Sequence, residues 1–283
     1  MSLARIFHKI LKKSNEMSCE KYGLALITGA TSGIGKATAE LFAQKGVNLI
    51  LSGRNQLELK QLQVILSKKV NVQIIQADLA EKEERQFVLD AIHGQVPDLV
   101  INNAGFGLYG DALTYSTQEQ LNMLDVNGRA VLEMTLKAGD ALISSKKKGV
   151  ILNISSAAAF QILPTMAVYA ASKTFVNHFS QALDFEFKKN GIRVLTLCPG
   201  MVDTKFQIRA GGKMDKEQMG VMSASFVAEQ IWKQIEELNP LLIIDWKYRL
   251  MTLISFLLPK SWIAAIVERN IGKRIKDKTQ NLG

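Results

Sequence analysis

A short apolar run followed at once by a glycine-rich turn and a helical pattern constrains this fold most. Residues 24–28 read Leu-Ala-Leu-Ile-Thr, residues 29–35 read Gly-Ala-Thr-Ser-Gly-Ile-Gly, and Ala37, Leu41 and Phe42 follow at helical spacing. Glycines in such a turn let the backbone approach a dinucleotide diphosphate, and the amides at the helix start attract its charge. The order of strand, turn and helix therefore predicts a dinucleotide cradle.

The next hundred residues alternate short apolar runs with helical patterns. Strands are predicted over 47–52, 72–75 and 99–101, with helices over 56–67 and 82–93 between them. This alternation is typical of right-handed crossovers and a parallel sheet. A ligand is expected at the carboxyl edge of that sheet.

Composition favours one globular domain. The 283 residues are 47% hydrophobic and include only 5 prolines, so no low-complexity linker divides them. The two cysteines, Cys19 and Cys198, lie far apart and match no metal-ligand spacing, and the 3 histidines are scattered. We expect no metal site, and the cysteine usage fits a reducing, cytoplasmic compartment.

The net charge of +9 is concentrated at the two ends. Residues 1–21 contribute +3 and residues 246–283 contribute +6, which leaves residues 22–245 neutral. A nucleic-acid-binding fold would carry a basic stripe on its body, so that class of partner is not expected. We interpret 1–21 as a basic amphipathic extension, 22–245 as the catalytic domain and 246–283 as an apolar and basic helical extension.

Arg54 follows the second predicted strand, where no carboxylate is present. An acidic residue at this position binds the adenosine ribose hydroxyls, whereas a basic one accommodates a 2'-phosphate. A guanidinium binds phosphate through paired hydrogen bonds, so Arg54 favours NADP(H) over NAD(H). An exposed arginine that merely opens the next helix is the alternative.

The ordered motifs from residue 24 to about residue 245 resemble the short-chain dehydrogenase/reductase family. The matching residues are Thr28, Gly29, Gly33, Gly35, Asp78, Asn102 to Gly105, Asn127, Ser156, Tyr169, Lys173, Pro199, Gly200 and Thr204. The resemblance implies a single Rossmann-like, doubly wound α/β domain with a mostly parallel seven-stranded sheet. It also implies a homodimer or homotetramer.

The resemblance assigns most of the chain's expected site residues. Those expected to bind the cofactor are Gly29, Thr31, Ser32, Gly33, Ile34, Gly35, Arg54, Asp78, Leu79, Asn103, Ala104, Gly105, Tyr169, Lys173, Pro199, Gly200, Val202 and Thr204. The catalytic residues would be Asn127, Ser156, Tyr169 and Lys173.

Each of the four implied catalytic residues has a role in hydride transfer between the nicotinamide and a carbonyl or carbinol carbon. Tyr169 would donate a proton to the developing alkoxide, and Ser156 would hold the substrate oxygen. Lys173 would bind the nicotinamide ribose, and Asn127, expected in a helix, would support a water-linked proton path. Together with the oxidised nicotinamide, Lys173 is expected to lower the pKa of Tyr169 from its ordinary value near 10.

Residues 205–222 are expected to form a variable substrate lid with a methionine-rich wall. The expected reaction interconverts a ketone and a secondary alcohol on an apolar, lipid-derived substrate. The alternative is a non-catalytic NADP(H)-sensing or scaffolding protein.

The extension 246–283 is apolar over 250–258 but is interrupted by Pro259 and Lys260, so a spanning helix is not expected. A helix on a membrane surface and a cap over the substrate cleft remain equal alternatives, with subunit contact third.

Overall fold

The computed structural model describes residues 22–204, 206, 210, 221–259 and 261–265. The expected extension 1–21 and most of the expected lid lie outside these residues. The strands are β1 Leu24–Thr28, β2 Asn48–Gly53, β3 Val72–Gln76, β4 Leu99–Asn102, β5 Gly149–Ile154, β6 Ile192–Cys198, β7 Val202–Asp203, β8 Met222–Ser223 and β9 Leu241–Ile243. The α-helices are α2 Gly33–Gln44, α3 Gln56–Leu66, α4 Lys82–Gln95, α5 Thr117–Leu124, α6 Ala130–Ser144, α7 Ala167–Phe187, α9 Ala224–Glu237 and α10 Trp246–Leu257.

Seven strands form one sheet in the order β3-β2-β1-β4-β5-β6-β9, and each neighbouring pair is parallel. The order reverses between β1 and β4, which creates a crevice beyond the carboxyl ends of these strands. The predicted doubly wound α/β class is confirmed, and this sheet is wholly parallel.

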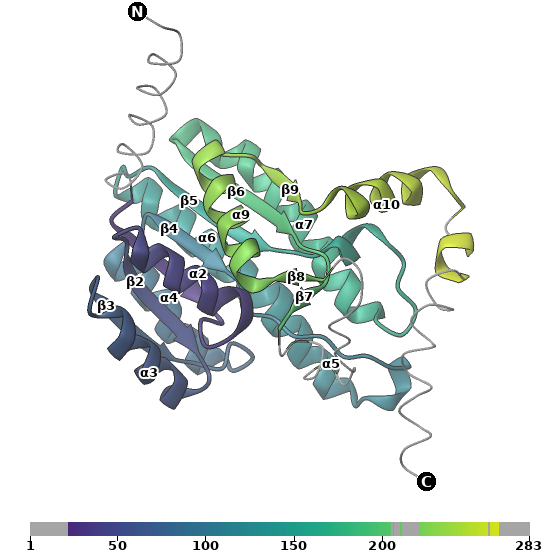
Figure 1. Cartoon of the computed structure of the whole chain (residues 1–283), viewed down its shortest axis with the longest axis horizontal. Helices are drawn as coiled ribbons and strands as arrows, with labels where there is room; N and C mark the ends of the chain where they lie inside the picture. The colour runs from purple at the N-terminus through teal and green to yellow at the C-terminus, as the bar shows by residue number, and fades with distance from the viewer. Residues whose placement is uncertain (1–21, 205, 207–209, 211–220, 260, 266–283) are drawn as a thin grey trace, which may run out of the picture.

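Helices cover both faces of the sheet, as the run of fully buried strand residues requires. Figure 1 shows α2 and α9 side by side on the near face. Phe42 of α2 packs edge-on against Trp232 of α9 at 5.1 Å between ring centroids. On the opposite face, Val88 of α4 and Met134 of α6 belong to a second buried cluster. The sheet is therefore held between two apolar layers.

A buried ion pair fixes the start of β6 against the end of α7. Arg193 donates from Nε to Asp184 Oδ1 at 2.7 Å and from Nη2 to Oδ2 at 2.8 Å. The Val194 amide also donates to Asp184 Oδ1 at 2.9 Å. The carboxylate is thus satisfied by three donors, as a buried charge requires.

The segment that carries Asn127 departs from the regular helix predicted for it. A π-helical turn, Asp125–Arg129, separates α5 from α6. Each such turn inserts one extra residue into the helical path and often occurs at functional sites. Here it places Asn127 fully inside the protein.

Helix α10 begins directly after β9 and extends outward from the carboxyl edge of the sheet (Figure 1). Asp245 caps α10 by accepting a hydrogen bond from the Lys247 amide at 3.0 Å. A further short helical stretch covers residues 261–265.

Candidate active site

A cleft of about 490 Å³ opens at the carboxyl edge of the sheet. It is lined by residues from the glycine turn, from the ends of β2, β4, β5 and β6, and from α7 and α10. All but two of the residues expected to bind cofactor or substrate line it. The exceptions are Gly35 and Asn127, which lie beneath the surface of the cleft.

The glycine turn has the geometry that a diphosphate requires. Gly29 and Gly33 have positive φ angles of 63° and 54°, which favour glycine. A Cβ on Gly33 would lie 2.8 Å from Thr204 Cγ2, and one on Gly35 would overlap the Gly29 carbonyl oxygen. The side chain of Ser32 does not cap α2, and the first turn of α2 has no acidic residue. The turn and the helix start therefore fit a nucleotide diphosphate.

The loop after β4 is held against the glycine turn. Thr28 Oγ1 accepts hydrogen bonds from the amides of Asn103 at 3.1 Å and Ala104 at 3.0 Å. Asn103 Nδ2 donates to the Thr28 carbonyl at 2.9 Å. A Cβ on Gly105 would lie 3.3 Å from Lys173 Nζ, so this position allows the lysine to reach the cleft.

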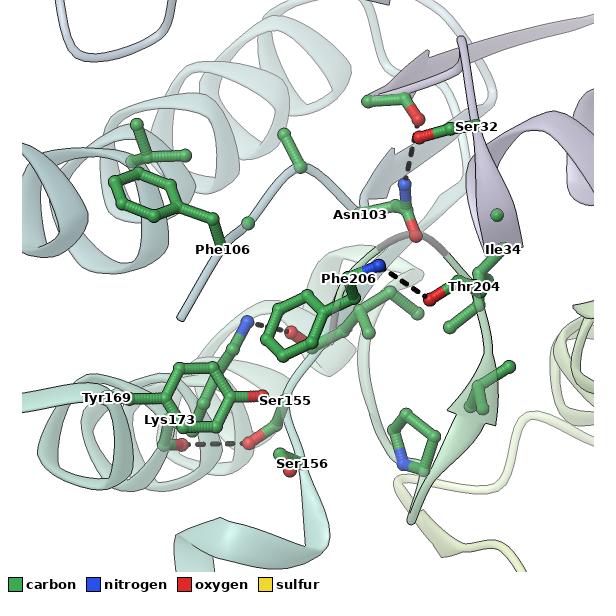
Figure 2. A pocket seen from close by; sticks show the side chains of 18 of the residues that line it. Ser32, Ile34, Asn103, Phe106, Ser155, Ser156, Tyr169, Lys173, Thr204 and Phe206 are labelled. Atoms are coloured by element: carbon green, nitrogen blue, oxygen red, sulfur yellow. Dashed lines mark hydrogen bonds between the residues drawn. The ribbon is translucent and has the colours of Figure 1, made fainter. Parts of the chain in front are cut away.

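Tyr169 and Lys173 lie one turn apart on α7 and face the end of β5 (Figure 2). Lys173 Nζ donates to the Ile154 carbonyl at 2.9 Å and lies 6.0 Å from the centroid of the Tyr169 ring. Ser155 Oγ donates to the Lys173 carbonyl at 2.8 Å. The end of β5 therefore fixes both the backbone and the side chain of Lys173.

Burial dominates the acid-base properties of this pair. It lowers the pKa of Lys173 to about 8, because the protonated amine loses its hydration. Burial also raises the pKa of Tyr169, although a hydrogen bond with Ser156 acts in the opposite direction. The side chains alone thus keep Tyr169 a neutral acid, and the expected lowering of its pKa would need a further positive charge.

Ser156 performs two functions at the mouth of the cleft. Its hydroxyl accepts a hydrogen bond from the Ala158 amide at 3.1 Å and so caps the short 3-10 helix η3, Ala157–Phe160. The same hydroxyl interacts with the Tyr169 phenol and lowers the pKa of that phenol, against the larger effect of burial. Both residues line the cleft, where one oxygen atom of a substrate could meet both hydroxyl groups.

Asn127 supports the site from below. Its Oδ1 accepts from the Phe106 amide at 3.0 Å, and its Nδ2 donates to the Phe106 carbonyl at 2.8 Å and to Ser172 Oγ at 3.3 Å. These bonds link the loop after β4 to α7. A Cβ on Gly105 would lie 3.0 Å from Asn127 Oδ1, so the amide sits under the same glycine that faces Lys173.

The far end of the cleft lies beyond β2 and β3. Arg54 follows β2 and is exposed, and its Nη1 is 3.4 Å from Asp78 Oδ2. Glu58, in the first turn of α3, also lines this end. The sequence pattern predicted Asp78 at this end but not Glu58, because Glu58 belongs to the following helix and only the first turn of α3 brings it to the cleft.

Several wall residues were not predicted from the sequence, including Phe106, Tyr109, Leu163 and Met166. Phe206 belongs to the predicted lid, and Tyr248 and Met251 belong to the extension for which a cap over the cleft was one alternative. The centroid of the Phe206 ring lies 5.7 Å from that of the Tyr169 ring (Figure 2). A Cβ on Gly107 would lie 3.0 Å from Phe206 Cζ, so Phe206 also packs against Gly107. The Tyr109 amide donates to the Ala210 carbonyl at 2.9 Å, so described residues of the expected lid contact the loop after β4.

Helix α10 completes the cleft through Tyr248 and Met251. Tyr248 Oη accepts a hydrogen bond from the Met201 amide at 3.1 Å. A Cβ on Gly200 would overlap the Tyr248 ring, so glycine at this position permits the close approach. Farther along α10, Ser255 Oγ donates to the Phe160 carbonyl at 3.1 Å.

Comparison with known proteins agrees with this geometry. Residues 23–214 match the short chain dehydrogenase family model. A Staphylococcus epidermidis protein described as an uncharacterized oxidoreductase is 33% identical over 190 residues, which cover 66% of this chain and 81% of that protein.

Two solved structures are also similar. A short-chain dehydrogenase from Sphingobium yanoikuyae in complex with NADPH has 28% identity and a TM-score of 0.75, covering 82% of this chain and 92% of its own. A bulky-bulky ketone specific alcohol dehydrogenase from Comamonas testosteroni has 28% identity and a TM-score of 0.70, covering 78% and 85%. Because the family model spans most of the chain, and the cradle, the tyrosine, the lysine and the serine meet in one cleft, this protein belongs to the short-chain dehydrogenase/reductase family of oxidoreductases.

Proposed function

We propose that this oxidoreductase uses NADP(H) to interconvert a bulky apolar ketone and its secondary alcohol. The convergence of Tyr169, Ser156 and Lys173 on a largely apolar cleft carries this proposal. The bound nicotinamide supplies or accepts the hydride. The protein positions the carbonyl and moves one proton.

In the direction of ketone reduction, the neutral Tyr169 phenol is ready to donate its proton. The substrate oxygen would accept hydrogen bonds from Tyr169 and Ser156, both of which stabilise the charge that develops on it. Lys173, protonated below a pKa of about 8, adds positive charge near the phenol as its proton leaves. Hydrogen bonding to Ile154 keeps this amine in place throughout.

The walls support an apolar substrate. Phe106, Leu163, Met166, Phe206 and Met251 surround the space next to Tyr169 and Ser156. The same cleft also contains the residues expected to hold the nucleotide, so cofactor and substrate would lie next to each other in it. The Comamonas testosteroni relative, described as specific for bulky-bulky ketones, provides a parallel for such a substrate.

Arg54 supports NADP(H) over NAD(H). It is exposed at the end of β2, and its contact with Asp78 is long, at 3.4 Å, which leaves the guanidinium able to bind a phosphate. The Sphingobium yanoikuyae relative holds NADPH.

The test is NADPH oxidation with a panel of bulky ketones and small water-soluble ketones. Tyr169→Phe should nearly abolish turnover, whereas Tyr22→Phe, at a buried tyrosine away from the cleft, should not. Arg54→Gln should lower kcat/KM for NADPH by roughly 10-fold to 100-fold, the value of a charge-assisted hydrogen bond, and leave kcat/KM for NADH nearly unchanged. Arg129→Gln, at a similarly exposed arginine, is the matched control.

Full activity in Tyr169→Phe would refute the proton-donor role. Equal loss with NADPH and NADH in Arg54→Gln would refute the phosphate contact. Tight NADPH binding without turnover of any ketone would instead favour a sensing role.

A further inference from the structure

Helix α10 has a polar side toward the domain and an apolar side toward solvent, the reverse of an ordinary surface helix. The side that faces the domain carries three hydroxyl residues at helical spacing, Tyr248, Thr252 and Ser255. Tyr248 bonds the Met201 amide, Ser255 bonds the Phe160 carbonyl, and Thr252 is buried. Two of the three hydroxyl groups on this side therefore bind the domain through hydrogen bonds.

The opposite side of α10 is apolar and exposed. It consists of Trp246, Leu250, Leu253, Ile254 and Leu257, which are spaced to share one face. Leu257 is 75% exposed and Trp246 is 66% exposed. A surface helix normally buries its apolar face, and a contiguous exposed apolar face marks an interaction site.

Charge indicates what covers this face. Residues 246–283 contain eight basic and two acidic side chains, whereas residues 22–245 are neutral. If two copies paired through α10 about a two-fold axis, Lys247 and Arg249 of both copies would be brought near one another with no acidic residue on either helix, and they would repel. A surface with negative charge and an apolar interior would attract the extension and accept the face, as interfacial helices do in anionic bilayers.

We propose that the apolar face of α10 binds an anionic lipid bilayer, with Trp246, Leu250, Leu253, Ile254 and Leu257 at the boundary between headgroups and acyl chains. Among the described residues, no helix is long and apolar enough to cross a membrane, so the contact is peripheral. Because Tyr248 and Met251 of the same helix line the cleft, the bound enzyme holds its substrate site beside the bilayer. The proposal goes beyond the oxidoreductase function and does not depend on it.

The experiment uses the full chain and two kinds of vesicle, phosphatidylcholine alone and phosphatidylcholine mixed with phosphatidylglycerol. Flotation should recover the protein with the mixed vesicles at low salt, less with neutral vesicles, and less as salt is added. Brominated lipid should quench tryptophan emission. The chain has three tryptophans, of which Trp232 is buried in the core and Trp246 and Trp262 are exposed. Replacing Trp246 and Trp262 together by phenylalanine should therefore remove the quenching.

The decisive variant is Leu253→Gln with Leu257→Gln, two positions that do not line the cleft. It should weaken partitioning into mixed vesicles by at least ~10-fold, because two leucines lose their transfer into the apolar boundary. The matched control, Val64→Gln with Ile65→Gln, changes two residues of α3 that are 67% and 57% exposed and should bind like the wild type. Turnover of a water-soluble ketone should be equal in all three proteins.

Three results would overturn the proposal. One is that the intact protein stays with the soluble fraction at low salt. Another is that the α10 variant floats as well as the wild type, which would assign binding to another segment, such as residues 1–21. The third is that the wild type does not bind vesicles and that light scattering gives a smaller mass for the α10 variant than for the wild type. The apolar face would then be an interface between two copies of the chain.

Discussion

Replacing Lys173 by methionine tests the energetic cost of the buried amine. Lys173 is 4% exposed, and burial lowers its pKa from 10.5 to about 8. At 1.36 kcal/mol for each pKa unit, this difference means that folding disfavours the protonated side chain by about 3 kcal/mol. Methionine has a similar length and no charge, so the variant does not lose free energy by burying a protonated amine. It also loses the hydrogen bond to Ile154, worth about 1 kcal/mol.

The net effect is a gain of about 2 kcal/mol in the free energy of unfolding at pH 7. The gain depends on pH in a defined direction. Below pH 8 the amine is protonated in both states, and the wild type bears the whole cost. Between pH 8 and 10.5 only the unfolded chain keeps the proton, so the stability of the wild type rises with pH. The advantage of Lys173→Met should therefore shrink across this interval.

Urea unfolding at pH 6.5, 8 and 9.5, without added nucleotide, measures the difference directly. Lys60→Met, at an exposed lysine of α3, controls for the general effect of the substitution. The same Lys173 variant should lose turnover by about 100-fold or more, because charge stabilisation near Tyr169 is removed. If Lys173→Met is less stable than the wild type at pH 7, or if the difference is the same at every pH, the buried amine does not carry the cost inferred here.

Two further variants test the packing around the site by urea unfolding. Gly200→Ala should destabilise the protein by about 2 kcal/mol, because the added Cβ overlaps the Tyr248 ring. In a Tyr248→Ala background the same substitution should cost nothing. An equal cost in both backgrounds would contradict the contact between Gly200 and Tyr248. Asp184→Asn should cost about 3 kcal/mol by leaving Arg193 without its buried partner, whereas Asp125→Asn in an exposed pair should cost less than about 1 kcal/mol. If Asp184→Asn and Asp125→Asn lower the free energy of unfolding by similar amounts, burial does not make the Asp184–Arg193 pair more important for stability.

Local sequence patterns predicted the sheet well because its strands are short, apolar and bounded by turns. The first strand was predicted with the bounds observed for β1, and the next three were within one residue of β2, β3 and β4. Burial on both faces makes inner strands such as β1 and β4 nearly continuous apolar runs, which are visible in sequence. The strand, turn and helix order likewise positioned the cradle, since phosphate binding there depends on backbone geometry set by nearby glycines.

Features that depend on long-range packing were not predictable in this way. The π turn around Asn127 has no local period to distinguish it from an α-helix, and its position is stabilised by bonds to Phe106 and Ser172. A cap over the cleft was one alternative for the extension that contains Tyr248, but Tyr248 itself could not be singled out, because its contact with Gly200 joins two distant segments. The pKa of Tyr169 was expected to fall through Lys173 together with the oxidised nicotinamide; among the groups of the protein itself, burial has the largest effect and raises this pKa.

The position of α10 also bears on how the enzyme is made. The nucleotide cradle forms from the first strand and helix, whereas Tyr248 and Met251 follow the seventh strand of the sheet. A chain leaving the ribosome therefore presents the glycine turn first, the cleft residues that follow β5 and β6 later, and the last wall of the cleft only after all seven strands of the sheet have been synthesised.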